Sequence, residues 1–295
     1  MSLKIGYIGL GIMGKSIAAN ILKSGFKVTV FNRSKPAMDE MYRLGAIVVN
    51  SASEVAAVSD IVFTNLPDSP DVEKVVLGKN GIIEGAKQSL IIVDNSTIKP
   101  ATARHIAKEV ERSGHSFLDA PVSGGDVGAR NATLTIMVGG KKEALDKVMV
   151  VFMAMGKSIT HVGESGAGQV AKAANQIMVA AQMAALGELL VFAKKTGVDP
   201  SKVIDAIKGG AAQCWAIDTK PQRIFQGNRS PGFKAYMQLK DLGIVMDTAN
   251  EYGIPLPVTK ETTALFQSMV DSGMGELDNS AVLGILENRA GVKVS

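Results

Sequence analysis

The sequence predicts an α/β N-terminal domain followed by an all-α C-terminal domain, with one long helix joining the two. Up to about residue 163, short β-rich runs alternate with helical stretches, as in a mostly parallel sheet covered by helices on both faces. Beyond residue 163, helical periodicity dominates, beginning with one long apolar stretch at 166–196. We therefore expect domains at 1–163 and 164–295.

The first strand and helix are joined by a glycine-rich turn. Residues 4–8, KIGYI, read as a buried strand, and residues 15–25 read as a helix that ends in glycine. Between a strand and a helix, the spacing G-x-G-x-x-G is typical of a Rossmann dinucleotide-binding domain. Two glycines let the backbone turn and approach a pyrophosphate, and the third lets helix pack on strand. The cofactor-binding residues predicted here are Gly9, Leu10, Gly11, Ile12, Met13 and Gly14.

The end of the second strand, KVTVF at 27–31, indicates which dinucleotide is bound. NAD-specific sites usually carry an acid here for the ribose hydroxyls. This chain has Asn32, Arg33, Ser34 and Lys35 instead. Arg33 can fork onto a 2′-phosphate and its three neighbours can assist. The pattern favours NADP, with use of both NADP and NAD as the alternative if Arg33 is merely exposed to solvent.

The remaining alternation places polar loops on one rim. Ligands of such sheets bind at the carboxyl ends of the strands. That rim carries Leu66, Pro67, the segment 95–97 and the segment 123–125. Further strands are expected at 46–49, 60–67, 90–97, 116–122, 134–140 and 158–163, with helices at 35–45, 51–59, 68–78, 100–114 and 142–155. Helices of the second domain are expected at 166–196, 200–208, 213–226, 235–253, 257–273 and 278–290.

The long helix carries one lysine in an otherwise uncharged turn. Asn175 and Gln176 follow Lys172 by three and four residues, so the three side chains share one helical face. A lysine with amide partners on an apolar helix is a candidate proton donor. The alternative is a lysine that lies along the surface with its charge in water.

A serine–glycine loop follows the strand at 116–122. The N–H groups of Ser123, Gly124 and Gly125, with the serine hydroxyl, would suit a carboxylate. The alternative is an ordinary tight turn.

Composition excludes several classes of function. The net charge is +4, the basic residues are scattered, and aromatic residues make up 5%, so no nucleic-acid surface is expected. The single cysteine, Cys214, excludes an internal disulfide and fits a reducing cytoplasm. The three histidines lack metal-ligand spacing, so no metal site is expected. We expect neither a signal peptide nor a membrane span, and a cytoplasmic location.

Four segments resemble the β-hydroxyacid dehydrogenase family and occur in that family's order. They are IGYIGLGIMG near the start, LDAPVSGGDVGARNATLTIMVGG at 118–140, GAGQVAKAANQ at 166–176 and FKAYMQLKDLGIVMDTA at 233–249. Within this family the segments LPDSP, NGIIEGAK, KAANQ and LDNSAV are most similar to the tartronate semialdehyde reductase branch.

The resemblance implies roles for individual residues. Lys172 matches the catalytic lysine, and Ser123, Gly124 and Gly125 match the loop that holds the substrate carboxylate. Leu66, Pro67, Thr97 and Lys240 match positions near the cofactor, while Phe233 and Asp241 match residues lining the closed site. Many members carry Asn four residues after the lysine, where this chain has Gln176. Either Asn175 or Gln176 would then meet the substrate.

The resemblance implies an enzyme that transfers a hydride between NADPH and a small semialdehyde, most simply reducing tartronate semialdehyde to glycerate. Lys172 would stabilise the growing oxyanion and donate a proton, and burial and a nearby charge such as Lys240 would lower its pKa. Alternatives are 3-hydroxyisobutyrate, succinic semialdehyde with glyoxylate, and D-3-hydroxybutyrate-type substrates. Imine-reducing relatives typically lack the lysine, and members that lost catalysis and only bind cofactor replace it. The expected partners are a small carboxylate and further copies of the chain, as a homodimer or homotetramer.

Overall fold

The structure is a computed structural model that describes residues 3–294. The chain divides into two compact units, the first ending at Lys172 and the second beginning at Ala173. The dividing point lies inside the long helix α9 (Ala167–Lys195), which runs from one unit into the other. The predicted order of a sheet domain, a long helix and a helical domain is confirmed.

Unit 1 is built on a nine-stranded sheet. Its strands are β1 (Lys4–Ile8), β2 (Lys27–Phe31), β3 (Ile47–Val48), β4 (Ile61–Thr64), β5 (Ile91–Asp94), β6 (Ser116–Asp119), β7 (Val122–Ser123), β8 (Leu134–Gly140) and β9 (Gly156–Gly163). Their order is β3-β2-β1-β4-β5-β6-β8-β7, with β9 paired to β8. Strands β1 to β6 pair in parallel, whereas β8 runs antiparallel to β6 and β7. The carboxyl ends of β1, β4, β5 and β6 therefore share one edge.

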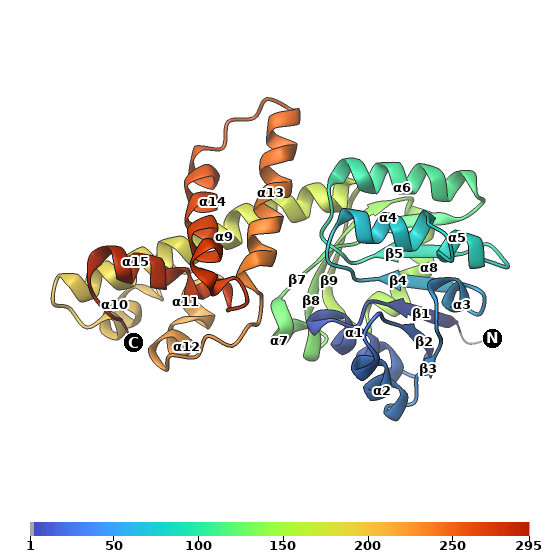
Figure 1. The fold of residues 1–295 in the computed structure, drawn as a ribbon, viewed down its shortest axis with the longest axis horizontal. Coiled ribbons are helices and arrows are strands. Elements are labelled where there is room, and N and C mark those ends of the chain that lie inside the picture. Colours follow the sequence, from blue (N-terminus) through green and yellow to red (C-terminus); the bar gives the residue numbers. More distant parts are fainter. Residues whose placement is uncertain (1–2, 295) are drawn as a thin grey trace. The chain divides into compact units, whose positions relative to one another are not determined.

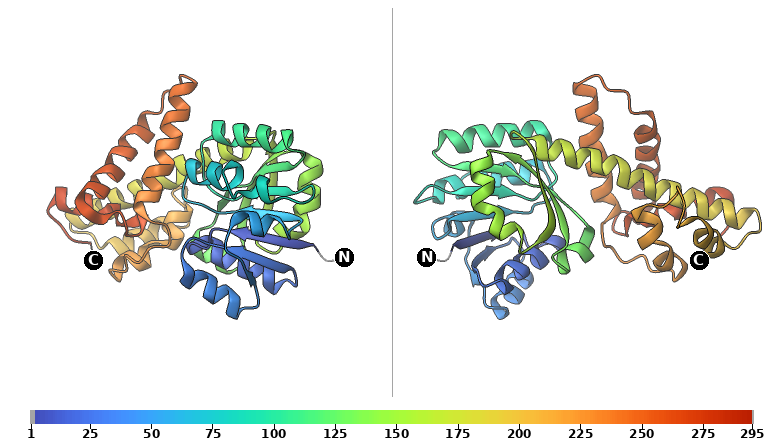
Figure 2. Two further views of the ribbon diagram at one scale, coloured as in Figure 1. Left: turned by 45° about the vertical axis from the view of Figure 1, so that its right-hand side comes forward. Right: turned by 180° about the vertical axis from the view of Figure 1, so that it is seen from behind.

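Helices cover both faces of this sheet (Figures 1 and 2). They are α1 (Ile12–Lys23), α2 (Lys35–Arg43), α3 (Ala52–Ala56), α4 (Ser69–Leu77), α5 (Ile82–Gly85), α6 (Pro100–Arg112), α7 (Gly125–Arg130) and α8 (Lys142–Phe152). One core joins α1, α2, α7 and α8 to strand residues such as Tyr7 and Phe63. A second core joins the helices α3, α4, α5 and α6 to the strand residues Ile8 and Val62. Neighbouring strand residues enter opposite cores because side chains alternate along a strand.

Unit 2 contains the rest of α9 and a set of shorter helices. They are α10 (Pro200–Ile207), α11 (Trp215–Thr219), α12 (Pro221–Phe225), α13 (Ala235–Glu251), α14 (Pro257–Met269) and α15 (Leu283–Ala290), with a π turn at Val270–Met274 and a 3₁₀ turn at Asn279–Val282. The helix expected at 213–226 is two helices, because Pro221 has no N–H to continue the first. The core of unit 2 gathers Met183, Leu190, Leu242 and Phe266 from α9, α13 and α14.

Helix α9 is unusually apolar. Within residues 3–294 it is the one helix that is long and apolar enough to cross a bilayer, with a mean hydropathy of 1.6. This was not expected from the sequence, since polar residues such as Gln169 and Lys172 interrupt the apolar run. Half of that apolar window is buried inside the protein, and core helices often meet the same criterion. A single helix of this kind is therefore weak evidence for a membrane span.

Candidate active site

The glycine turn between β1 and α1 has the geometry that the motif predicts. Gly9 has a φ of 99°, and a Cβ there would lie 2.2 Å from the carbonyl oxygen of Asn65. A Cβ on Gly14 would lie 2.0 Å from the carbonyl oxygen of Gly9. Gly11 instead faces open space, and α1 begins at the next residue. The first N–H groups of a helix have no partner within it. The turn therefore fits a phosphate approaching over Gly11.

Asn32 supports this turn from the end of β2. The Leu10 N–H donates to Asn32 Oδ1 at 3.0 Å, and Asn32 Nδ2 donates to the carbonyl oxygen and the hydroxyl of Ser34 at 3.1 Å each. The Asn32 amide is thus held by the protein itself. Arg33, Ser34 and Lys35 are exposed at the surface of unit 1.

A buried hydrogen-bond network shapes the loops after β4 and β5. Thr64 Oγ1 and Ser96 Oγ donate to Asp94 Oδ1 at 2.7 and 2.6 Å. The Leu66 N–H donates to Ser96 Oγ at 2.8 Å. This network fixes the backbone of Leu66 against the segment that contains Thr97. The two predicted cofactor loops are held together within unit 1.

Lys172 is buried, with only 7% of the residue exposed. Its Nζ donates to the carbonyl oxygen of Val122 at 2.8 Å. Val122 directly precedes Ser123, and the serine–glycine loop continues through Gly124, with a φ of 133°, into α7. A Cβ on Gly125 would meet open space. Unit 1 therefore brings the ammonium group to the strand that carries the predicted carboxylate loop.

Asp119, at the end of β6, was not predicted from the sequence as a functional residue, and the structure places it at the start of α9. Its Oδ1 accepts the Gly166 N–H at 2.7 Å, and its Oδ2 accepts the Gln169 N–H at 2.9 Å. Burial raises the pKa of Asp119 from 3.8, these N–H groups oppose the rise, and Asp94 adds to it, giving a pKa of about 6. The carboxylate thus caps the start of α9 from outside the helix.

In unit 2, the amides that follow Lys172 join a polar chain with α13. Gln176 is buried, and its Nε2 donates to Asp241 Oδ2 at 2.6 Å. Asn175 Nδ2 donates to Gln176 Oε1 at 2.7 Å. Lys240 Nζ lies 2.9 Å from Asp241 Oδ1. Four predicted site residues are therefore connected, and Asp241 is the acceptor at the centre.

Phe233 lies in a loop that is anchored by Asp278, a second residue the sequence reading missed. Asp278 Oδ2 accepts the N–H groups of Gly232 and Phe233 at 2.9 and 3.3 Å. Lys220 Nζ pairs with Asp278 Oδ1 at 2.7 Å, inside the protein. Burial pushes the pKa of Asp278 up, but the charge and hydrogen bond of Lys220, together with hydrogen bonds from Ser280 and the Gly232 N–H, outweigh burial, so the pKa lies below its usual value.

Comparison with known proteins identifies the family. A family model described as the NAD-binding domain of 6-phosphogluconate dehydrogenase matches residues 4–163, and one described as the NAD-binding of NADP-dependent 3-hydroxyisobutyrate dehydrogenase matches residues 166–286. The 2-hydroxy-3-oxopropionate reductase of Escherichia coli is 40% identical, covering 99% of this chain and 100% of that protein. The 2-(hydroxymethyl)glutarate dehydrogenase of Eubacterium barkeri is 38% identical, covering 100% of this chain and 98% of that protein.

The chain belongs to the 3-hydroxyisobutyrate dehydrogenase-like β-hydroxyacid dehydrogenases. It is an NAD(P)-dependent oxidoreductase of small hydroxyacids. A solved structure of Mycobacterium tuberculosis 3-hydroxyisobutyrate dehydrogenase with L-serine has a TM-score of 0.88 and 33% identity, covering 97% of this chain and 99% of that chain.

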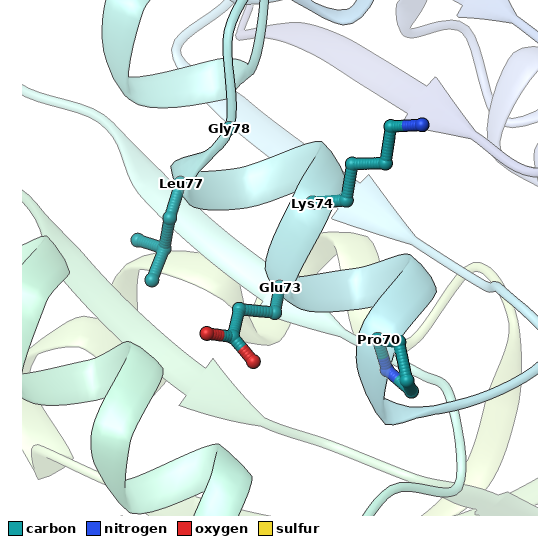
Figure 3. A pocket seen from close by; sticks show the side chains of 5 residues that line it. All are labelled: Pro70, Glu73, Lys74, Leu77 and Gly78. Carbon is teal, nitrogen blue, oxygen red and sulfur yellow. The ribbon is translucent and has the colours of Figure 1, made fainter.

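Across residues 3–294, no group of three or more His, Cys, Asp or Glu side chains is placed to hold a metal ion. A hollow on α4 is lined by Pro70, Glu73, Lys74, Leu77 and Gly78. In Figure 3 the Glu73 and Lys74 side chains point to opposite sides of this helix, so they do not converge on a ligand.

Proposed function

We propose that the protein reduces tartronate semialdehyde to glycerate with NADPH, as a cytoplasmic enzyme. The full-length similarity to a 2-hydroxy-3-oxopropionate reductase supports this substrate. The observation that carries the proposal is the buried Lys172 ammonium, 2.8 Å from the carbonyl oxygen that directly precedes Ser123. An ammonium group there can stabilise negative charge on the aldehyde oxygen of a substrate whose carboxylate binds to the serine–glycine loop at 123–125.

NADPH is the proposed cofactor. The Gly9–Gly14 turn fits its phosphates, since Gly11 opens to solvent at the start of α1. No carboxylate follows β2 to repel a 2′-phosphate. Because the Asn32 amide is bonded to Leu10 and Ser34, we assign the phosphate contact to the exposed Arg33, assisted by Ser34 and Lys35.

The proposed chemistry is the addition of a hydride and a proton across an aldehyde. The cofactor supplies the hydride. The N–H groups of Ser123, Gly124 and Gly125, with the serine hydroxyl, hold the substrate carboxylate. Lys172 stabilises the negative charge that develops on the aldehyde oxygen and then donates a proton to it. In the reverse direction the neutral lysine accepts that proton.

The residues of unit 2 are proposed to serve the same reaction. Gln176 is buried and bonded to Asp241, so we assign it a supporting role and give the substrate contact to the half-buried Asn175. Asp241 orients Gln176 and Lys240, and Lys240 provides positive charge for the cofactor. Phe233 supplies an apolar surface for the substrate.

The experiment that tests the substrate and cofactor together is a panel of initial rates. NADPH and NADH oxidation is followed with tartronate, methylmalonate and succinic semialdehydes and with glyoxylate. The highest kcat/KM is expected for tartronate semialdehyde with NADPH. A higher value for a longer semialdehyde would reject the proposed substrate, and a higher value with NADH would reject the role of Arg33.

Oxidation of 3-hydroxyisobutyrate is the second candidate. It is favoured by the match of residues 166–286 to the NADP-dependent 3-hydroxyisobutyrate dehydrogenase model. The same serine–glycine loop and lysine would serve this substrate. The methylmalonate semialdehyde rate in the panel decides between the two.

We also propose that the chain forms a homodimer or homotetramer. Met178 and Phe192 on α9 are 58% and 72% exposed, and large apolar side chains on one helix favour a subunit contact. Light scattering coupled to size exclusion measures the mass directly. A 30.9 kDa particle at assay concentration would contradict this proposal.

A further inference from the structure

The start of α9 is held by a carboxylate from the sheet. Asp119 is fully buried, and its two oxygens accept the N–H groups of Gly166 and Gln169. These N–H groups belong to the first turn, where a helix has no acceptors of its own. Gly166 has no side chain with which to cap the helix. Asp119, from strand β6, therefore accepts the hydrogen bonds that the residue directly preceding a helix usually accepts.

Two glycines admit this carboxylate. A Cβ on Gly139 in β8 would lie 2.6 Å from Asp119 Oδ1. A Cβ on Gly168 in α9 would lie 2.5 Å from the Asp119 carbonyl oxygen and 2.9 Å from Oδ2. Glycine inside a helix weakens it by roughly 0.5–1 kcal/mol relative to alanine. Gly168 is therefore explained by the close approach of Asp119 and not by helix formation.

Gln169 attaches the same turn to the loop after β5. Its Oε1 accepts the Ile98 N–H at 3.1 Å, and its Nε2 donates to the Ser96 carbonyl oxygen at 2.9 Å. Lys172 follows three residues later on α9, with its Nζ at the Val122 carbonyl oxygen. Residues 119 to 122 thus fix the start of the helix and also receive the lysine that the helix carries.

We propose that Asp119 is a positioning residue for the reaction, whose carboxylate anchors α9 so that the Lys172 ammonium stays at the Val122 carbonyl. This rests on the proton-donor role proposed for Lys172. The charged groups around the anchor are Asp94 on β5 and Arg104 on α6, whose side chain packs against Gly166. The N–H groups of Gly166 and Gln169 hold the pKa of Asp119 down against the effect of burial. Protonation therefore weakens these two hydrogen bonds and favours local opening of the first turn while Asp119 stays buried, unlike global unfolding, which exposes Asp119 to water.

The test is a double-mutant cycle in kcat. Asp119→Asn keeps the size of the side chain but points an amide N–H at a backbone N–H. We expect kcat to fall by about tenfold or more, because a misplaced Lys172 ammonium lowers the rate of the reaction. In the Lys172→Ala background, Asp119→Asn should cause no further loss, since coupled residues are not additive. The matched control is Asp199→Asn, at the exposed cap of α10, which should leave kcat unchanged.

Two outcomes in the cycle separate the claims. If Lys172→Ala lowers kcat by about two or more orders of magnitude but Asp119→Asn has wild-type kcat, or lowers the remaining kcat by the same factor in both backgrounds, positioning by Asp119 is wrong and the role of Lys172 stands. If Lys172→Ala retains full turnover, the proton-donor role fails, and this proposal fails with it.

A measurement on the wild-type protein does not depend on the variant folding. Amide hydrogen exchange over residues 164–176 should lose protection as the pH falls through about 6, together with kcat, relative to the segment that begins α10. Protection that stays constant while kcat falls would overturn the anchor.

Discussion

At residue 33, an exposed guanidinium follows β2 where NAD-specific proteins carry a carboxylate. Arg33→Asp removes the phosphate partner and adds a repelling charge. We expect kcat/KM for NADPH to fall by about one to two orders of magnitude, which corresponds to the free energy of a hydrogen bond to a charged group. The kcat/KM for NADH should change little. Arg43→Asp, the same charge change at an exposed arginine ending α2, is the control. An unchanged NADPH to NADH ratio in Arg33→Asp would remove the basis for NADP preference.

Asp119 makes a pH prediction about stability. Its pKa is about 6 in the folded protein and 3.8 ordinarily, so the folded state binds this proton more tightly than the unfolded state. The free energy of unfolding should therefore fall as the pH rises from about 4 to about 6, by up to about 3 kcal/mol from this group. Urea unfolding of wild type and Asp119→Asn at pH 4.5 and 7 measures the difference. Parallel changes in the two proteins would contradict the raised pKa.

Individual residues were predictable only where a local motif names them. The glycine spacing from Gly9 to Gly14 predicts dinucleotide binding because the strand, the turn and the helix that form the motif are contiguous in the sequence. Asp119 has no such signal. Its partners lie 47 and 50 residues further along the chain, so only the folded sheet brings them together. Asp278 was missed for the same reason, since its partner Lys220 is 58 residues away.

At the scale of elements, the loop that carries Phe233 depends on one buried ion pair. Lys220→Met leaves the Asp278 carboxylate buried without its cation, and we expect a loss of about 3–5 kcal/mol in unfolding free energy. Lys208→Met, which breaks the exposed pair with Asp205, should cost about 1 kcal/mol or less. Urea denaturation compares the two variants. Equal losses would show that the buried pair does not anchor this loop.

Elements with a strong periodic pattern were predictable, and short ones were not. Strand β8 was predicted with its bounds, because LTIMVGG is an unbroken apolar run ending in glycine. Helices α5 and α7, of four and six residues, were not predicted, because segments this short cannot show the repeating apolar pattern of a helix. The direction of β8 depends on the connection through β7 and α7, which hydropathy does not encode.

At the scale of the whole molecule, each unit keeps its own hydrophobic packing, and α9 begins in unit 1 and contributes apolar side chains to the core of unit 2. The buried polar residues of α9 are Gln169, Lys172 and Gln176, the residues of this helix to which we assign roles in the proposed reaction. The fold class was predictable because β/α alternation gives way to helical periodicity along the chain. The family, and with it NAD(P)-dependent hydroxyacid oxidoreduction, follows from motifs that span nearly the full length.

The central claim is that Lys172 supplies the proton, and kcat of Lys172→Ala tests it most directly. NADPH-dependent reduction of tartronate semialdehyde should fall by about two or more orders of magnitude, the value of a general acid. Lys194→Ala, at an exposed lysine on the same helix, should match wild type. Near wild-type turnover in folded Lys172→Ala would contradict the account, because the buried ammonium at Val122 would then have no part in the reaction.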